Sequence, residues 1–286
     1  MKPNITVVGS INMDLITTVR RFPNQGQTLY GEDFMMKPGG KGANQAVAAA
    51  RLGANVNFIG KIGKDPLGYE LKEHLIKEGI HVDHITLSDK STGIANVLIY
   101  ERDNRIIYVP GANNDVTVGY VLAKKESILQ SDFVVLQMEI PIPTIIACID
   151  LCNAHHIPVI LNPAPAKTLP EQTWEKCTFI TPNEEEASEL LLPIYQEKLI
   201  TTLGSKGTSY MGKMIPSFKA NVLDTTGAGD TFNGALAYYL SCGEPIYDAI
   251  EKANAAASIA IEALGAQNGM PTRSQVEARI QEKSRA

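Results

Sequence analysis

Short runs of apolar and β-branched residues alternate along the chain with stretches that have a helical pattern. Such alternation is typical of βαβ units, in which helices cover both faces of a largely parallel sheet. Ligands of these sheets bind beyond the carboxyl ends of the strands. We therefore predict an α/β fold built on a mostly parallel central sheet. The predicted strands are Ile5–Val8, Asn57–Ile62, Phe133–Met138, Pro158–Leu161, Thr178–Thr181 and Lys198–Leu203.

Length and composition limit the class of protein. At 286 residues the chain is long for one minimal domain and short for three, so we predict a single large α/β domain over residues 1–286. Hydrophobic residues make up 44% and charged residues 20%, the balance of an ordinary globular protein. No run approaches the roughly 18 apolar residues that cross a bilayer, and the start lacks a signal-peptide pattern. We expect a cytoplasmic protein with no membrane partner.

Charge and cysteine content point away from two further classes. The net charge of −5 argues against nucleic acid as a partner, because binding to phosphate backbones needs concentrated lysine and arginine. Cys148 and Cys152 are one helical turn apart and could bind a metal ion. The four cysteines form no paired CxxC motifs, however, so reduced thiols in the core are the favoured interpretation.

Two segments, approximately residues 15–37 and 92–111, depart from the alternating pattern. Both are rich in residues that favour strands and show no helical period. We predict that they form a small antiparallel sheet. The alternative is a pair of surface hairpins without a role, which is disfavoured because exposed apolar β edges usually need covering.

A glycine turn followed by a helix is the strongest chemical signal, in the segment Asp224–Ala237. Gly227 and Gly229 allow a sharp turn whose N–H groups approach a ligand closely. The helix that follows presents free N–H groups and a positive dipole end, which favour an anion. Asp230 lies at this site, where a carboxylate is suited to accept the proton of an attacking hydroxyl. The alternative is an ordinary acidic residue in the first turn of a helix.

A second glycine turn precedes an alanine-rich helix in the segment Gly39–Gly53, with Gly53 at the expected C-terminal cap. Together the two segments resemble the two signatures of the phosphofructokinase-B (PfkB) family of carbohydrate kinases, in the same order. The matching residues are Gly39, Gly40, Gly42, Asn44, Ala46, Gly53, Asp224, Thr225, Gly227, Ala228, Gly229, Asp230, Gly234 and Ala235. The resemblance covers the chain from Ile5 to about Pro271 and includes Gly9–Asp14, Gln137–Glu139, Asn162–Ala166, Thr181–Glu184, Thr202–Gly207 and Gly265–Gln267.

The resemblance implies a ribokinase-like fold in which the small sheet is a lid over a sugar and the lids of two subunits pair in a homodimer. It implies ATP-dependent phosphorylation of D-ribose at O5, which gives D-ribose 5-phosphate and ADP. Asp230 would be the general base, and the amides of Gly227, Ala228 and Gly229 would form the anion hole. These amides would replace a Walker loop, since the chain contains no GxxxxGK[ST] sequence.

The resemblance also implies the binding residues. Those expected to bind ribose are Asn12, Asp14, Gly39, Gly40, Lys41, Asn44, Glu139 and Asp230. Those expected to bind ATP are Asn183, Thr202, Gly204, Ser205, Lys206, Gly207, Gly229 and Asn254. Asn183 and Glu186 are expected to hold Mg²⁺ through water, since hard oxygen ligands suit this ion. The residues expected to bind a monovalent cation, K⁺, mostly through carbonyls, are Asp224, Thr226, Ala260, Ala263, Gly265 and Gly269.

Two alternatives stay open. Another kinase of the family would act on deoxyribose, fructose or a nucleoside, although the polar residues Asn12, Asp14 and Glu139 favour a small pentose. A sugar-sensing binding protein would keep the fold without turnover, but it would have no need of Asp230 as a base. Both would use a small-molecule partner.

The match is weaker on the nucleotide side. Only twelve residues, Ala187–Lys198, separate Glu186 from the strand that leads to Thr202. One helix over about residues 184–192 is nearly the shortest crossover between parallel strands. The hairpin around Met211–Lys213 is also short. Either the wall beside the adenine is trimmed or residues are missing from this numbering.

Overall fold

A six-stranded parallel sheet forms the centre of the protein, with strand order β10-β9-β8-β1-β4-β5. The structure, a computed structural model, describes residues 2–101, 103–190 and 192–285. The strands are β1 (Asn4–Val8), β4 (Asn55–Gly63), β5 (Ile85–Ser88), β8 (Phe133–Gln137), β9 (Val159–Asn162) and β10 (Phe179–Ile180). The sequence analysis found all of these except β5, whose four residues include only two apolar ones.

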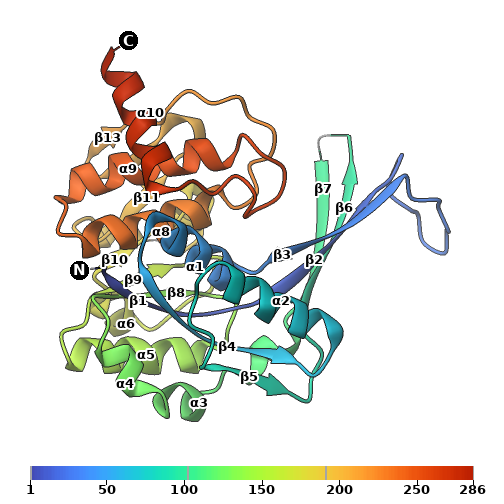
Figure 1. Cartoon of the computed structure of the whole chain (residues 1–286), viewed down its shortest axis with the longest axis horizontal. Coiled ribbons are helices and arrows are strands. Elements are labelled where there is room, and N and C mark those ends of the chain that lie inside the picture. Colours follow the sequence, from blue (N-terminus) through green and yellow to red (C-terminus); the bar gives the residue numbers. More distant parts are fainter. Residues whose placement is uncertain (1, 102, 191, 286) are drawn as a thin grey trace.

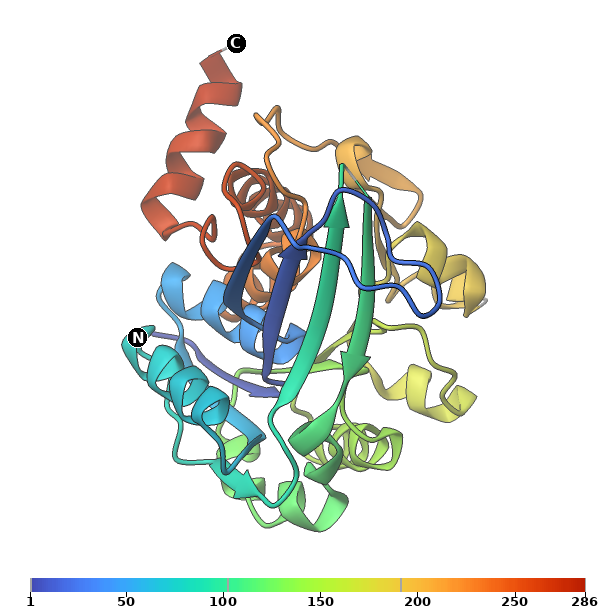
Figure 2. The same cartoon turned by 90° about the vertical axis from the view of Figure 1, so that its right-hand side faces the viewer.

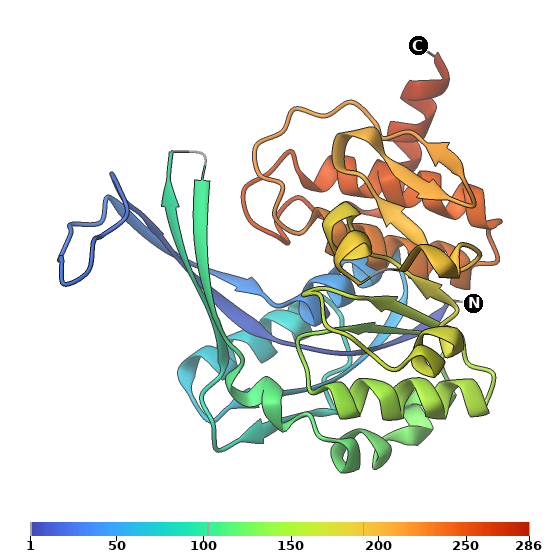
Figure 3. The same cartoon turned by 180° about the vertical axis from the view of Figure 1, so that it is seen from behind.

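Helices cover both faces of the central sheet (Figures 1 and 3), and alternating side chains of its strands enter two separate cores. Val7 of β1 enters one core, and its neighbour Val8 enters the other, as strand geometry requires. The first core includes residues of α1 (Lys41–Leu52), α2 (Pro66–Lys77), α8 (Ala228–Ser241) and α9 (Ile246–Ala260). The second includes residues of α3 (Val118–Leu122), α4 (Lys125–Leu129), α5 (Ile142–Ala154) and α6 (Glu171–Lys176). Both faces of the sheet are therefore covered.

Cys148 and Cys152 of α5 are free thiols buried in the second core, as the favoured interpretation expected. The remaining helix of ordinary length, α10 (Arg273–Arg285), lies at the carboxyl end of the chain (Figure 1). None of the helices in the described parts of the chain is both long and apolar enough to span a membrane.

A mixed four-stranded sheet, here called the lid, projects from the body of the protein (Figures 1 and 3) and faces the viewer in Figure 2. Its strands, in the order β3-β2-β6-β7, are β2 (Asn12–Thr18), β3 (Asp33–Gly39), β6 (Gly93–Tyr100) and β7 (Asp103–Val109). The two outer pairings are antiparallel as predicted, but β2 and β6 are parallel. The sequence analysis did not predict the parallel central pairing, which arises because the chain returns from β3 to β6 through the whole α1–β4–α2–β5 crossover.

The lid also departs from its predicted extent. Its first strand begins at Asn12, before the predicted start, and residues 19–32 between β2 and β3 form no strand. Leu29 and Tyr30, which favoured a strand by residue type, lie in this connection. Tyr30 is fully exposed, so no packing supports an extended conformation there.

A third, three-stranded antiparallel sheet lies beyond β10. It contains β11 (Ile200–Thr202), β12 (Thr208–Tyr210) and β13 (Lys213–Ile215). Isolated parallel bridges connect the β11 segment to the segment of β10. The hairpin between β12 and β13 turns at Met211 and Gly212, both with positive φ, which is the conformation of a tight two-residue turn.

The short crossover that leads to β11 contains α7 (Glu184–Glu189) and a 3-10 turn, η2 (Leu192–Tyr195). The helix ends earlier than the predicted limit near residue 192, and Leu191 lies outside the described residues. This short helix is sufficient to connect β10 to β11, because the chain before it and the strand after it lie side by side. The parallel bridge between Asn183 and Thr202 shows this.

Candidate active site

Helix α8 begins at the predicted glycine turn. Gly227 has φ of 79°, and a Cβ at this position would lie 2.5 Å from the carbonyl oxygen of Ala266, so no other residue fits. Gly229 is exposed, and a Cβ there would meet no atom within 4 Å. The amide of Ala228 donates to the Thr225 carbonyl at 3.2 Å. Of the three amides predicted to bind an anion, this one is therefore already paired within the turn.

Close packing of two helices brings the two glycine segments together. A Cβ on Gly234 of α8 would lie 2.5 Å from the Gln45 carbonyl of α1, so the helices can approach only because this side chain is absent. As a result, two side chains of α1 reach Asp230. Asn44 Nδ2 donates to one carboxylate oxygen at 2.8 Å, and Gln45 Nε2 donates to the other at 3.0 Å.

Asp230 is thus held through both oxygens by neutral donors and is only 7% exposed. This arrangement fixes the orientation of the carboxylate without neutralising it by a direct ion pair. Gln45 received no role in the sequence analysis, although it lies within the first signature. A glutamine in an otherwise alanine-rich, buried helix is the signal that could have identified it.

A second polar cluster surrounds Glu139, directly after β8. Its carboxylate accepts hydrogen bonds from Ser10 Oγ at 2.5 Å, from Asn12 Nδ2 at 3.3 Å and from the Lys41 amide at 3.1 Å. Asn12 is oriented in turn by Asn113, whose Nδ2 donates to Asn12 Oδ1 at 2.7 Å. Ser10 lies within the matching segment Gly9–Asp14, but neither Ser10 nor Asn113 was predicted as a site residue, because a supporting contact across the fold is not visible in the sequence.

Asp14 lies on lid strand β2, close to the other carboxylates. Burial raises the pKa of Asp14 to about 7, and the negative charges of Glu139 and Asp230 act in the same direction. A Cβ on Gly39 would lie 2.4 Å from Asp14 Oδ2, so this predicted glycine leaves room for the carboxylate. Lys41 is the nearby cation. Burial lowers its pKa, but Asp230, Glu139 and Glu186 outweigh this effect and raise the pKa overall.

These groups line a cleft of about 1080 Å³ between the lid and the amino end of α8. On the lid side the lining includes Val97, Ile106 and Tyr108, so an apolar face opposes the polar one. The residues predicted for ribose or K⁺ that line the cleft are Asn12, Asp14, Gly40, Lys41, Asn44, Glu139, Asp224, Thr226, Asp230 and Gly265. Gly227, predicted for the anion hole, also lines it. A small polyhydroxyl molecule bound here would meet several hydrogen-bonding partners.

The residues predicted to bind ATP do not line this cleft. Asn183 follows β10 and Thr202 ends β11, and the two residues form a parallel bridge, whereas Gly229 lies in α8 and Asn254 in α9. Asn183 caps α7 in a reciprocal pair of bonds with Glu186, so both predicted Mg²⁺ residues also stabilise the helix. Asn254 is buried and bonds to Thr208 and to the Ile215 carbonyl. Its amide therefore joins α9 to the third sheet.

The remaining predicted nucleotide residues form the turn after β11. Gly204, Ser205 and Lys206 form the 3-10 turn η3 (Gly204–Lys206), and Gly207 follows it with φ of 101°. A Cβ at Gly207 would lie 2.2 Å from the Ile215 carbonyl, so glycine is required by the third sheet itself.

Of the predicted K⁺ residues, Asp224 and Thr226 lie in the turn before α8, and Gly265 is hydrogen-bonded to Asp224. Asp224 accepts hydrogen bonds from the Thr226 amide at 2.9 Å and from the Gly265 amide at 2.8 Å. Burial raises the pKa of Asp224, but these hydrogen bonds outweigh burial and lower it overall. A Cβ on Gly269 would lie 2.1 Å from the Ala260 carbonyl oxygen, so a side-chain oxygen ligand at this position would not fit.

The comparisons with known proteins agree with this geometry. Residues 2–273 match the profile of the pfkB family carbohydrate kinases. The chain belongs to this family. Its relatives include the ribokinase of Bacillus subtilis (strain 168), 45% identical over 287 residues that cover 96% of this chain and 98% of the relative. The ribokinase of Lactococcus lactis subsp. lactis (strain IL1403) is 44% identical over 291 residues, which cover 97% of both chains.

A solved structure of Arabidopsis thaliana ribokinase complexed with ribose and ATP has a TM-score of 0.89 and 30% sequence identity. The alignment covers 98% of this chain and 99% of that one. The contact between Asn44 and Asp230 therefore lies within a fold that this chain shares with that ribokinase.

Removal of the Asp14 charge should change how stability depends on pH. The folded state binds the Asp14 proton more tightly than the unfolded state, so this stabilisation is present below about pH 4 and is lost as the pH rises to about 7. The free energy of unfolding of Asp14→Asn minus that of the wild type should therefore increase between pH 5 and pH 8, by about 2 kcal/mol.

Urea unfolding at the two pH values measures this difference. The same comparison with Asp248→Asn, an exposed aspartate on α9, controls for the loss of one charge. An Asp14→Asn difference that does not change with pH would show that Asp14 titrates in its ordinary range.

Proposed function

We propose that this chain phosphorylates D-ribose at O5 with ATP and releases D-ribose 5-phosphate and ADP. One observation carries the proposal. Asp230, at the amino end of α8, lines the same cleft as Asn12, Asp14 and Glu139. The ribokinase relatives and the ribokinase complex with ribose and ATP support the choice of substrates.

The sugar would bind between the lid and α1. The side chains of Asn12, Asp14, Asn44 and Glu139 offer donors and acceptors for its hydroxyl groups, and each buried hydroxyl needs such a partner. A sugar that lacks one hydroxyl would leave a protein group unpaired, which lowers affinity. Ionised Asp14 accepts hydrogen bonds from hydroxyls, so binding should favour pH values above its raised pKa.

Asp230 would accept the proton of the O5 hydroxyl as this oxygen attacks the terminal phosphate. Its two oxygens are already oriented by Asn44 and Gln45, so little reorganisation accompanies the reaction. The amino end of α8 stabilises negative charge on the transferred group. Gly229 suits this position because its main chain faces open space with no Cβ in the way.

ATP would extend from α8 toward the bridge between Asn183 and Thr202. Mg²⁺ would reach the phosphates through water near Glu186, whose pKa is raised mainly by burial. K⁺ would bind near Asp224, whose ionised carboxylate and neighbouring carbonyls suit a large, weakly bound cation. Mg²⁺ would neutralise charge on the phosphates, and K⁺ would stabilise the turn that carries the anion site.

The base can be tested by one isosteric substitution. Asp230→Asn should lower kcat by about 10²-fold or more while ribose and ATP still bind, because the amide accepts no proton. ADP release with ribose and ATP measures kcat, and calorimetry measures the affinity for ribose. Turnover near the wild-type rate would remove Asp230 from this role.

The monovalent cation site predicts a dependence on the salt used. The rate of ADP release should be higher in K⁺ than in Na⁺ at equal ionic strength, because carbonyl-rich coordination discriminates between the two ions. Asp224→Asn should reduce the difference by weakening the site. Equal rates of the wild type in the two salts would contradict the K⁺ proposal.

We also propose a homodimer formed through the lid. The strand registers place Met36 and Ile107 on the same face of the lid, opposite the face of Ile106 that lines the cleft. On this outer face Ile107 is 64% exposed and Phe34 is 58% exposed. Such an apolar β surface is typical of an interface.

A charged side chain on the outer face of the lid should separate the subunits. We expect Ile107→Lys to shift the protein toward the monomer in analytical ultracentrifugation. Ile76→Lys on α2 is the matched control, since Ile76 is also exposed, at 45%, and lies outside the lid. A wild-type protein that sediments as a monomer at micromolar concentration would contradict the dimer.

A further inference from the structure

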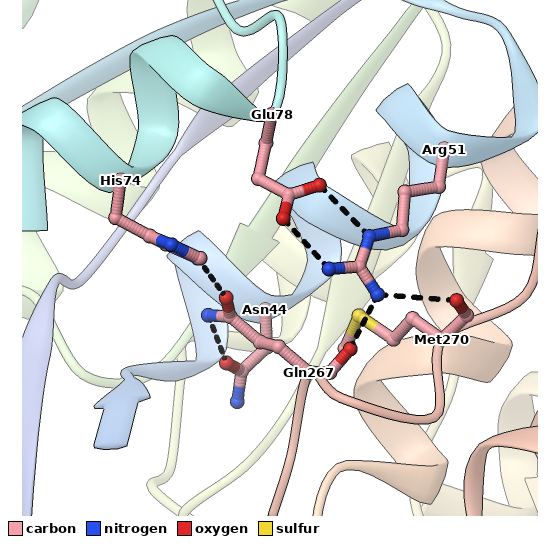
Figure 4. A network of polar contacts seen from close by, with 6 residues as sticks. All are labelled: Asn44, Arg51, His74, Glu78, Gln267 and Met270. Carbon is pink, nitrogen blue, oxygen red and sulfur yellow. Dashed lines mark hydrogen bonds and ion pairs between the residues drawn. The ribbon is translucent and has the colours of Figure 1, made fainter. Parts of the chain in front are cut away.

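A chain of hydrogen bonds leads from Asp230 to a histidine on the outer helix α2. Asn44 Nδ2 donates to Asp230 at 2.8 Å, and Gln267 Nε2 donates to Asn44 Oδ1 at 2.8 Å. Gln267 Oε1 lies 2.6 Å from His74 Nε2. Figure 4 shows the three outer members pointing toward one another from α1, α2 and the loop after α9.

The Asp230 carboxylate determines which group donates and which accepts in each of these hydrogen bonds. An ionised carboxylate only accepts hydrogen bonds, so Asn44 turns its NH₂ group toward Asp230 and leaves its oxygen for Gln267. Gln267 then turns its own NH₂ group toward Asn44. Its oxygen needs a donor, and His74 supplies the N–H. With Gln267 only 4% exposed and Asn44 5%, water cannot readily replace either partner.

The loop that carries Gln267 is fixed by a second set of contacts (Figure 4). Arg51 of α1 donates to the carbonyls of Gln267 and Met270 and forms two bonds with Glu78 at the end of α2. Glu78 has a lowered pKa, chiefly because of its hydrogen bond with Arg51. The main chain of the loop therefore has an anchor that does not depend on the Gln267 side chain.

The same loop contacts the turn around Gly227, which precedes α8 and carries the predicted anion site. The Ala266 carbonyl lies where a Cβ of Gly227 would be, and Gly265 donates its amide to Asp224. One short loop thus contacts the turn that begins α8, the predicted cation site and, through Gln267, the carboxylate of Asp230. The positions of these groups are linked by direct contacts.

We propose that Gln267 and His74 are positioning residues that orient Asp230 through Asn44. His74 supplies the terminal donor that keeps the amides of Gln267 and Asn44 in one orientation. Without it, either amide can rotate and present an oxygen to the carboxylate. The inference rests on the proposed role of Asp230 as the base and goes beyond it, because neither residue touches the substrate.

Gln267→Glu is the sharpest test, because it keeps the size of the side chain and the Arg51 contacts with the loop. Ionised glutamate cannot donate to Asn44, so in either orientation the Asn44 oxygen would face a carboxylate and its contact with Asp230 would no longer be fixed. We expect kcat to fall by about 10-fold or more, since small errors in the geometry of a reacting group can cost up to about 10²-fold. The KM for ATP should stay within about twofold of the wild-type value.

A pair of substitutions at His74 separates donation from packing. Glutamine can place its NH₂ group near the position of the histidine Nε2, whereas leucine has a similar bulk and no donor. We expect His74→Gln to keep kcat within about twofold and His74→Leu to lower it by about three- to tenfold. Thermal melting of all variants shows whether they fold.

The outcomes are distinguishable. Wild-type turnover by Gln267→Glu would overturn the proposal, and so would equal loss of activity in His74→Gln and His74→Leu. Asp230→Asn is measured in parallel. If it is inactive while Gln267→Glu is fully active, the base assignment stands and the hydrogen-bond chain is not needed. If Asp230→Asn turns over normally, the proposed base fails, and the positioning proposal fails with it.

Discussion

The close approach of α1 and α8 is the constraint on which the site depends. Gly234 lies directly against the main chain of α1, where any side chain would push the helices apart. Because the helices touch, Asn44 and Gln45 bond to Asp230 on the opposite helix. Neither helix alone contains the site, so the chemistry depends on packing between segments almost 200 residues apart in the sequence.

The cleft also concentrates negative charge. Burial, together with the charges of Glu139 and Asp230, raises the pKa of Asp14. Lys41 and Lys37 are cations in the lining of the same cleft. A surplus of carboxylates in a buried site opposes folding at neutral pH, and the surrounding amide donors offset part of this cost. In the proposed function the same carboxylates would accept hydrogen bonds from the sugar. The charges that lower the stability of the folded state would therefore be the ones that bind the ligand.

Much of the fold follows from local sequence. The βαβ pattern gave the parallel sheet, and the two glycine segments gave the beginnings of α1 and α8 at the expected residues. The parallel pairing of β2 and β6 was not predictable, because strand direction depends on the long crossover between them. The roles of Ser10, Gln45, Asn113 and Gln267 were missed for a similar reason. Each acts through a contact distant in sequence, and such a contact is not visible in the sequence even when the residue lies in a matching segment, as Ser10, Gln45 and Gln267 do.

Two of the four connections between the lid and the body are themselves parts of the sugar cluster. Only residues 9–11 separate β1 from β2, and β3 ends at Gly39, two residues before α1. Asp14 therefore travels with the lid, whereas Asp230 belongs to the body. Any hinge motion of the lid would change the distance between these carboxylates. The motion that closes the lid over a ligand would therefore also bring Asp14 and Asp230 together around it.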